Sequence, residues 1–171
     1  MTVNALAAIV ILTNAAFSVW FDTDTRCPAC VAYDLEPAEV IRAKRADIPF
    51  RADPRVPASD VAADYAKSGF DRGHMAPAAD FNFDRRALTE TYLFTNIAPQ
   101  VPELNRGAWA QFEAEIRTLA ASGTVHVVVF PIYTPGAPVR RMGRVRIPDA
   151  FEKVAYGWFG IRRLLAPNAA P

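Results

Sequence analysis

The segment AWAQFEAEIRTLAA, residues 108–121, and the segment VHVVVF, residues 125–130, decide the fold class of this chain. In the first segment four large apolar residues recur at offsets of three, seven and ten and therefore share one helix face: Trp109, Phe112, Ile116 and Leu119. Gly123 is a typical stop signal for a helix. The β-branched run after it predicts a buried strand, so the two segments predict an amphipathic helix over Ala108–Ala121 followed by a strand.

Further strands are expected on both sides of this helix. Their apolar, β-branched or aromatic runs lie at residues 17–21, 30–35, 145–147 and 154–159. The run Ile9–Leu12 is compatible with a first strand or with a degenerate signal peptide. Strands that flank a helical middle predict an α+β fold with a mixed, largely antiparallel sheet.

The remaining regions are expected to be irregular. Residues 36–69 contain four prolines, and only Asp60–Lys67 is compatible with a short helix. Phe70–Pro77 contains Gly73 and ends in proline, so it is predicted to be a turn or loop. Thr91–Ile97 fits a strand or a short helix equally well.

Length and composition restrict the class of protein. A chain of 171 residues with 51% hydrophobic residues predicts a single domain, residues 1–171, with a substantial core. The formal net charge of +1 excludes a disordered acidic tail and a histone-like basic protein, and taken alone it argues against a nucleic-acid partner. The apolar start is too short to span a membrane as a helix, so no membrane partner is expected.

The charge is unevenly distributed. Sixteen of the nineteen basic residues are Arg, the residue type suited to bidentate phosphate contacts. From Pro135 to the end the net charge is +5, and the remainder carries −4. This basic segment fits either a solvated surface or a phosphate-facing region built partly from Arg140, Arg141, Arg144 and Arg146.

The two cysteines, Cys27 and Cys30, form a Cys-Pro-Ala-Cys motif. No second motif completes a four-ligand zinc site, and the strand-like residues that follow do not fit a thioredoxin-type helix start. An incidental or locally bridged pair is favoured. Thiol–disulfide chemistry, which requires a thiolate at Cys27, is the weakest functional alternative.

The two histidines differ in their setting. His126 alternates with valines in an apolar strand, which favours a core or edge position without a chemical role. His74 follows Asp71, Arg72 and Gly73. A histidine with an ordinary pKa of about 6.5 suits a general base at neutral pH, so His74 is the candidate for that role.

Asn105, just before the predicted helix, fits either an N-cap or a neutral oxygen ligand for a divalent cation. Glu113 lies eight positions further along and is placed to reach water on such a cation rather than the cation itself. Arg117 follows four residues after Glu113, so these two side chains are expected to pair on the helix surface.

Four blocks of the chain, in a consistent order, resemble the DNA/RNA non-specific endonucleases, which are ββα-metal nucleases. The blocks are Phe50–Arg55, Ser68–Asp80 with the motif DRGHMAPAAD, Thr95–Gln100 and Leu104–Trp109. Fainter similarity reaches Val31–Leu35 and Ile147–Lys153, so most of the chain is covered. The resemblance implies a ββα-metal nuclease core within about residues 68–121 and one long catalytic helix.

The resemblance also implies roles for individual residues. It implies His74 as the general base, Arg72 as a catalytic-loop residue near phosphate, and Glu113 as the carboxylate that orients water on the cation. Asn105 is implied as the sole direct protein ligand of one Mg²⁺, with Mn²⁺ able to substitute. The implied supporting or substrate-binding positions are Arg117, Asn96 and Gln100, and the upstream phosphate-binding arginine is one of Arg45, Arg51 and Arg55.

The activity expected from this resemblance is hydrolysis of phosphodiester bonds in DNA and RNA, with little sequence preference, to 5′-phosphate products. The alternative is a catalytically silent nucleic-acid-binding module of the same fold. The resemblance further admits a homodimer, an inhibitor or immunity protein as a partner, and a secreted or periplasmic location.

Overall fold

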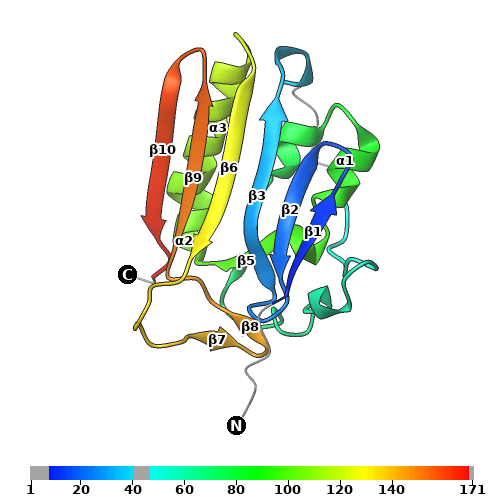
Figure 1. The fold of residues 1–171 in the computed structure, drawn as a ribbon, viewed down its shortest axis with the longest axis vertical. Helices are drawn as coiled ribbons and strands as arrows, with labels where there is room; N and C mark the ends of the chain where they lie inside the picture. Colours follow the sequence, from blue (N-terminus) through cyan, green and yellow to red (C-terminus); the bar gives the residue numbers. More distant parts are fainter. Residues whose placement is uncertain (1–7, 41–46, 170–171) are drawn as a thin grey trace.

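A six-stranded antiparallel sheet in the order β1-β2-β3-β6-β9-β10 dominates the computed structural model, which describes residues 8–40 and 47–169 (Figure 1). Its strands are β1 (Ile9–Thr13), β2 (Phe17–Asp22), β3 (Cys27–Leu35), β6 (Val125–Ile132), β9 (Ala150–Gly157) and β10 (Gly160–Pro167). Helices lie behind this sheet in the view of Figure 1. The predicted α+β fold with a mixed, largely antiparallel sheet is therefore confirmed.

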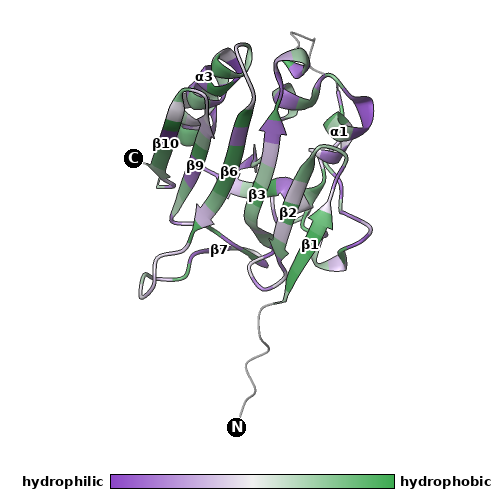
Figure 2. Ribbon diagram, turned by 45° about the horizontal axis from the view of Figure 1, so that its top comes forward, coloured by the Kyte–Doolittle hydropathy of each residue, from purple (hydrophilic) through white to green (hydrophobic). Residues whose placement is uncertain are grey.

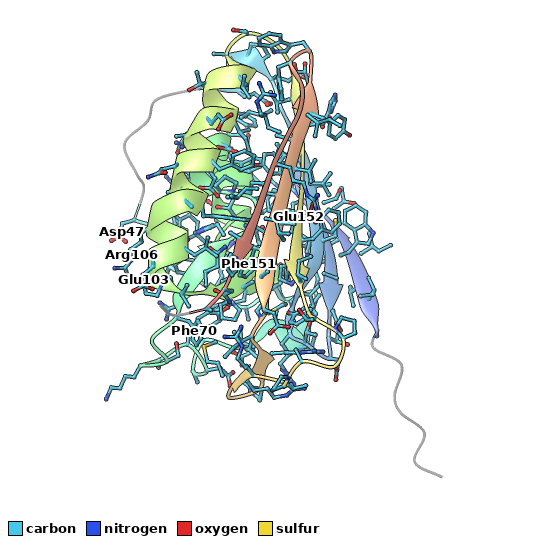
Figure 3. The ribbon with its side chains drawn as sticks, turned by 90° about the vertical axis from the view of Figure 1, so that its left-hand side faces the viewer. Asp47, Phe70, Glu103, Arg106, Phe151 and Glu152 are labelled. Atoms are coloured by element: carbon cyan, nitrogen blue, oxygen red, sulfur yellow. The ribbon has the colours of Figure 1, made fainter. Side chains whose placement is uncertain are left out.

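The sheet buries one face because its strands alternate in sequence as the pleat requires. Val125, Val127 and Val129 of β6 point inward and are at most 1% exposed. Figure 3 shows the same alternation on β9, where Phe151 points toward the helix side and Glu152 points away from it. The inward residues form the hydrophobic core with the long helix.

Figure 2 shows that several strands of the sheet contain many hydrophobic residues. Some of these residues lie on the outward face of the sheet. Large apolar residues that are exposed on these strands are Ile9, Ile11, Tyr156, Ile161 and Leu165. Within the described residues, no helix covers this face in Figure 1.

The predicted long helix is present as α3 (Ala110–Ala120), within two residues of the expected bounds. A short helix α2 (Pro102–Leu104) and a π-helical turn (Asn105–Trp109) precede it, and a kink at Gly107 lies between α2 and α3. Trp109, Phe112 and Ile116 are buried, as the apolar spacing predicts, and Leu119 is partly buried. Pro102 occupies the first position of α2, where its missing N–H needs no helical partner.

The segment Phe70–Pro77 is not the predicted turn or loop. Asp71–His74 forms strand β4, which pairs with β5 (Ile97–Gln100) in the register Asp71↔Gln100 and His74↔Ile97. Gly73 is required in this hairpin by close packing, because a Cβ on it would lie 2.2 Å from Gln100 Oε1. The glycine therefore marks a close approach between two strands rather than a turn.

Other elements also differ from expectation. Asp60–Lys67 forms turns instead of a helix, because a segment of this length is marginal without extensive packing and only Val61 and Tyr65 in it are buried. Thr91–Ile97 contains the 3₁₀ turn Phe94–Asn96 before β5. The expected strand at 154–159 is β9 and ends at Gly157. The expected strand at 145–147 is β8 (Val145–Arg146). Elements not predicted are α1 (Arg85–Glu90), β7 (Arg141–Met142), β10 and the 3₁₀ turns Pro37–Glu39, Pro57–Ser59 and Ala78–Phe81.

None of the helices within residues 8–40 and 47–169 combines the length and apolar character needed to cross a membrane.

Candidate catalytic site

His74 and Arg72 project from the same face of β4, because alternate residues of a strand share a face. The Phe50 ring contacts both: its centroid lies 5.3 Å from the His74 ring and 5.4 Å from the Arg72 guanidinium carbon. The Tyr92 ring meets the His74 ring edge to face at 5.0 Å. Aromatic packing thus fixes the orientation of the predicted base and of the neighbouring cation.

Asp71, one residue before Arg72 on β4, connects the strand to the long helix. Its Oδ2 accepts a hydrogen bond of 2.9 Å from Asn105 Nδ2, and Arg106 donates to both carboxylate oxygens, at 2.8 and 2.7 Å. Burial alone raises the pKa of Asp71, but the hydrogen bonds from Arg106 and Asn105 outweigh it and hold the pKa below its ordinary value. Asp71 is therefore an anionic anchor for Asn105.

The contact with Asp71 determines how the Asn105 amide is oriented. A carboxylate only accepts hydrogen bonds, so the amide nitrogen must face Asp71 and the carbonyl oxygen must face away from it. That oxygen accepts no hydrogen bond from any residue that the structure describes. The N-cap interpretation of Asn105 is wrong, because the residue has helical φ and ψ of −58° and −43° and the helix already begins at Pro102.

The π-helical turn begins at Asn105 itself, and Gly107 inside it departs from helical geometry with φ −103° and ψ −112°. Such turns are frequent at functional sites, because the extra residue changes the direction of nearby side chains. Figure 3 shows Arg106 and Glu103 at this end of the helix, on the side of the molecule away from the sheet.

Glu113, further along the helix, is held by a residue from the sheet. Lys153 Nζ donates a 2.8 Å hydrogen bond to Glu113 Oε1, and the Lys153 side chain is 0% exposed. The ammonium group also lies 4.5 Å from the centroid of the Trp109 ring. Sequence reasoning missed Lys153 as a site residue, although a lysine between the inward positions Phe151 and Ala155 was a usable signal.

The predicted surface pair between Arg117 and Glu113 is wrong. Arg117 Nη1 instead donates at 2.9 Å to Asp80 Oδ1, and Tyr33 Oη donates at 2.9 Å to Asp80 Oδ2. Asp80 is completely buried and available to Arg117, whereas the Glu113 carboxylate one turn away is paired with Lys153. Burial, with the negative charge of Glu113 as the next cause, raises the pKa of Asp80 to about 6.

This raised pKa predicts a pH-dependent contribution of Asp80 to stability. The folded state binds the Asp80 proton more tightly than the unfolded state, so this contribution is present at acidic pH and is lost as the pH rises toward 6 and above. Relative to Asp80→Asn, the wild-type free energy of unfolding should therefore fall by about 2 kcal/mol between about pH 4 and pH 7. Denaturant titrations at a series of pH values measure the difference.

The matched control is Asp64→Asn. Although burial raises the pKa of Asp64, its hydrogen bonds and charge contact with Arg144 lower it overall. The stability that Asp64 contributes is lost only as the pH falls below the ordinary pKa of an aspartate. The difference in free energy of unfolding between the wild type and Asp64→Asn should therefore stay constant between about pH 5 and pH 7. A constant difference for Asp80→Asn over the same range would refute the assignment of a raised pKa to Asp80.

Asn96 and Gln100 lie inside the protein rather than on a binding surface. Asn96 Oδ1 accepts from the Ala76 amide, and its Nδ2 donates to the Ala76 and Thr91 carbonyls, all at 2.9 Å. It therefore fixes the backbone two residues after His74. Gln100 is 0% exposed and packs against Gly73, and its amide atoms have no hydrogen-bond partner among the described residues.

The candidates for the upstream phosphate-binding arginine differ in how far their guanidinium groups are tied up by contacts within the protein. Arg55 is bound to the buried carboxylate of Asp53 through Nε at 2.9 Å and Nη2 at 2.6 Å, and also to Asn14 Oδ1. Arg51 is exposed, and its backbone bonds to Tyr92, the residue whose ring contacts His74. The geometry thus favours Arg51 over Arg55, while Arg45 lies outside the described residues.

The Arg-rich segment after Pro135 is engaged in internal contacts. Arg140 donates to the Pro148 and Asn168 carbonyls, and Arg144 binds the Asp64 carboxylate and the Asp60 carbonyl. The Arg146 guanidinium carbon lies 4.6 Å from the centroid of the Tyr133 ring. These guanidinium groups hold loops together, so the positive segment has a structural role in this fold, and a phosphate-facing role for it stays a prediction.

The two cysteines are free thiols. Burial raises the pKa of Cys27 to about 12 and that of Cys30 to about 11. Because the thiolate is the reactive form, these values argue against thiol–disulfide chemistry and against a locally bridged pair.

His126 occupies the outward face of a central strand, neither the core nor an edge. Its ring stacks on Tyr156 with centroids 4.9 Å apart, and its Nδ1 lies 2.7 Å from Asp34 Oδ1. It is thus on the opposite face of the sheet from the residues that hold Glu113.

The donors available for a cation can be stated from this geometry. Residues 8–40 and 47–169 contain no group of three or more His, Cys, Asp or Glu side chains that could hold a metal ion. The Asn105 carbonyl oxygen, turned away from Asp71, is a hard neutral donor of the kind that Mg²⁺ and Mn²⁺ accept. The residues present therefore fit a cation held by one protein oxygen, with water and substrate completing its coordination.

The chain is similar in sequence and in fold to known nucleases. A family model described as DNA/RNA non-specific endonuclease matches residues 3–162. Mitochondrial Endonuclease G of Homo sapiens is 34% identical over 177 residues, and the match spans 92% of this chain but only 59% of that protein. A nuclease of Nostoc sp. is 35% identical over 128 residues, which cover 72% of this chain and 46% of that protein. The EndoG/EndoGI complex, solved to explain EndoG inhibition, superposes with a TM-score of 0.84 and 28% identity over 93% of this chain and 74% of that chain.

Proposed function

Because the chain belongs to the DNA/RNA non-specific endonuclease family, we propose that it is a metal-dependent nuclease that hydrolyses DNA and RNA. One observation carries the proposal: Asp71 links Asn105, on the helix, to the same short strand that carries Arg72 and His74. A cation ligand, a candidate base and a phosphate-binding cation thus belong to one connected unit. We further propose that this unit lies in a single domain.

The roles of the side chains follow from their positions. Neutral His74 takes a proton from a water molecule that attacks the phosphorus in line, and Phe50 and Tyr92 hold its ring. Arg72 and the exposed Arg51 bind non-bridging oxygens of the phosphate. Glu113 accepts a hydrogen bond from water in the site and so orients it. Asn105 would hold a divalent cation, which would neutralise charge on the phosphate and on the departing 3′ oxygen. The 3′ oxygen takes a proton from solvent, and the product carries a 5′-phosphate.

The nucleic-acid contacts proposed here go to the phosphate backbone. Contacts of this type carry little base information, so cleavage should show weak sequence preference. A net charge of +1 is compatible with this chemistry, because the local placement of Arg72 and Arg51 decides phosphate binding rather than the total charge. An inhibitor protein is the partner we propose by analogy with the inhibitor-bound EndoG structure.

The direct test is nicking of supercoiled plasmid with and without a chelator. Cleavage should require Mg²⁺ or Mn²⁺, stop with excess EDTA and return when excess Mg²⁺ is added, because the phosphate charge is otherwise not neutralised. A single-stranded RNA substrate should behave in the same way. Activity that survives chelation would contradict the metal-dependent mechanism.

The same experiment tests the alternative of a silent binding module. Such a module predicts salt-sensitive binding of DNA or RNA and no cleavage with either cation. End-labelling of the products gives the chemistry of the cut: only 5′-phosphate ends agree with departure of the 3′ oxygen.

A further inference from the structure

Lys153 breaks the hydrophobic pattern of the strand that carries it. The inward positions of β9 are Phe151, Lys153 and Ala155, and all three are 0% exposed. A buried ammonium group is costly unless it is paired and hydrogen-bonded. For stability alone, an apolar residue would suit this position better than a lysine. A role of Lys153 in the candidate site would explain why a lysine is present.

The contacts of Lys153 point to that reason. Its ammonium group donates to Glu113 Oε1 at 2.8 Å and faces the Trp109 ring. The other charged or titratable groups near this pair are Asp80, Arg117 and Tyr33, and both Arg117 and Tyr33 donate to Asp80. Within the described residues, Lys153 is therefore the one cation that forms an ion pair with Glu113.

Glu113 and Asn105 are anchored in the same manner. Asp71 binds the amide nitrogen of Asn105, and Lys153 binds one carboxylate oxygen of Glu113. In each case the second terminal atom, Asn105 Oδ1 or Glu113 Oε2, accepts no hydrogen bond from the described part of the chain. Each anchor comes from a strand, and each leaves one oxygen for the site.

We propose that Lys153 is a positioning residue of the nuclease site, which binds one carboxylate oxygen of Glu113 and so directs the other toward water in the site. This inference rests on the proposed nuclease function. Lys153 is not expected to touch substrate, because its side chain has no exposed surface.

Removal of the ammonium group has a defined chemical result. Glu113 would remain only 14% exposed, without its cation and near the buried carboxyl of Asp80. An unpaired carboxylate in such surroundings takes up a proton at higher pH than a paired one. A protonated Glu113 accepts the hydrogen bond that orients water more weakly than the carboxylate does, and it can donate one instead.

The experiment compares wild type, Lys153→Met, Glu113→Gln and the double variant on a defined oligonucleotide at saturating Mg²⁺. We expect Lys153→Met to lower kcat by about 10-fold or more near pH 6.5, with KM changed less than about threefold. The loss of kcat in Lys153→Met should become smaller as the pH rises, because the acidic limb of its pH profile lies at higher pH than in the wild type. The double variant should be no slower than Glu113→Gln, because both changes remove one interaction.

The controls separate positioning from folding. Lys67→Met removes an exposed lysine and should leave kcat, KM and the pH profile unchanged, whereas Lys153→Arg should restore the wild-type pH profile at least in part. Equal losses at every pH, together with additive effects in the double variant, would overturn the proposal. If Lys153→Met does not fold, the double variant decides: a rate equal to that of Glu113→Gln supports positioning, and a clearly lower rate refutes it.

A wild-type protein without nuclease activity would contradict the proposed function rather than the contact. The contact then has its own readout, the titration of the Glu113 carboxyl carbon by ¹³C NMR in wild type and in Lys153→Met, or in Lys153→Arg if the first variant is unfolded. In Lys153→Met, a Glu113 titration at higher pH than in the wild type supports the anchoring, and an unchanged titration overturns it. In Lys153→Arg, a titration at the wild-type pH supports the anchoring, and a titration at a different pH overturns it.

Discussion

Replacement of His74 by alanine should lower the rate of plasmid cleavage by about 10²–10⁴-fold, the usual contribution of a general base. The imidazole is the only group on this face of β4 that can accept a proton near neutral pH, since its neighbour there is Arg72. KM for DNA should change little, because phosphate binding is assigned to the arginines. Initial rates at several plasmid concentrations measure both quantities.

The second histidine is the matched control for this variant. His126→Ala removes a ring of the same size that stacks on Tyr156 on the outward face of the sheet. Its cleavage rate should equal that of the wild type. Thermal unfolding of both variants separates lost chemistry from lost packing against Phe50 and Tyr92. A His74→Ala protein that is folded and retains more than about a tenth of the activity would contradict the assignment of the base.

Replacement of Asn105 by alanine should lower the rate by about 10²-fold or more at physiological Mg²⁺, because it removes the one oxygen assigned to the cation. Part of the rate should return at high Mg²⁺ concentration, since water can replace a single neutral ligand. Rates measured as a function of Mg²⁺ concentration give this apparent affinity. The effect should be larger than that of Arg51→Ala, which removes one of two cations assigned to phosphate.

Two further variants make this prediction specific. Asn105→Asp supplies a charged oxygen, yet it should also be impaired, because it loses the N–H that Asp71 accepts and places a second carboxylate beside the first. Asn82→Ala, which removes an amide that bonds only the nearby Ala79 carbonyl, should be unaffected. Full activity in Asn105→Ala at low Mg²⁺ would remove Asn105 from the mechanism.

Local sequence patterns predicted the helix and most of the sheet, because each of these elements buries one face and its apolar residues therefore recur with a fixed period. The spacing of Trp109, Phe112 and Ile116 predicts the helix side that is buried. The alternating burial of β2 and β6 follows from a period of two in the same way. The short helix α2 and the π-helical turn before Ala110 have no such apolar repeat and were not predicted.

Strand β4 could not be predicted from local preferences. Its four residues include Gly73, which normally indicates a turn, and its pairing partner β5 lies more than twenty residues further along the chain. The close contact between Gly73 and Gln100 exists only after the two strands pair. Proximity in sequence likewise suggested the wrong partner for Arg117.

The candidate site residues were named through family resemblance, whereas the anchors that orient two of them were not. Asp71 lies within the quoted motif but had no role assigned, and Lys153 belonged only to a faint match. Both are recognisable as anchors only in three dimensions, because Asp71 meets Asn105 across 34 positions and Lys153 meets Glu113 across 40. Charged residues that pair over such separations show no repeating pattern in the sequence from which the contact could be predicted.

The strand order also determines when during translation the sheet can close. Strands β3 and β6 are neighbours, with Leu35 paired to Val125, and the segment that carries His74 and Asn105 is made between them. Strand β9 with Lys153 is made later still. A growing chain therefore carries the candidate site residues before the strands that hold them can pair.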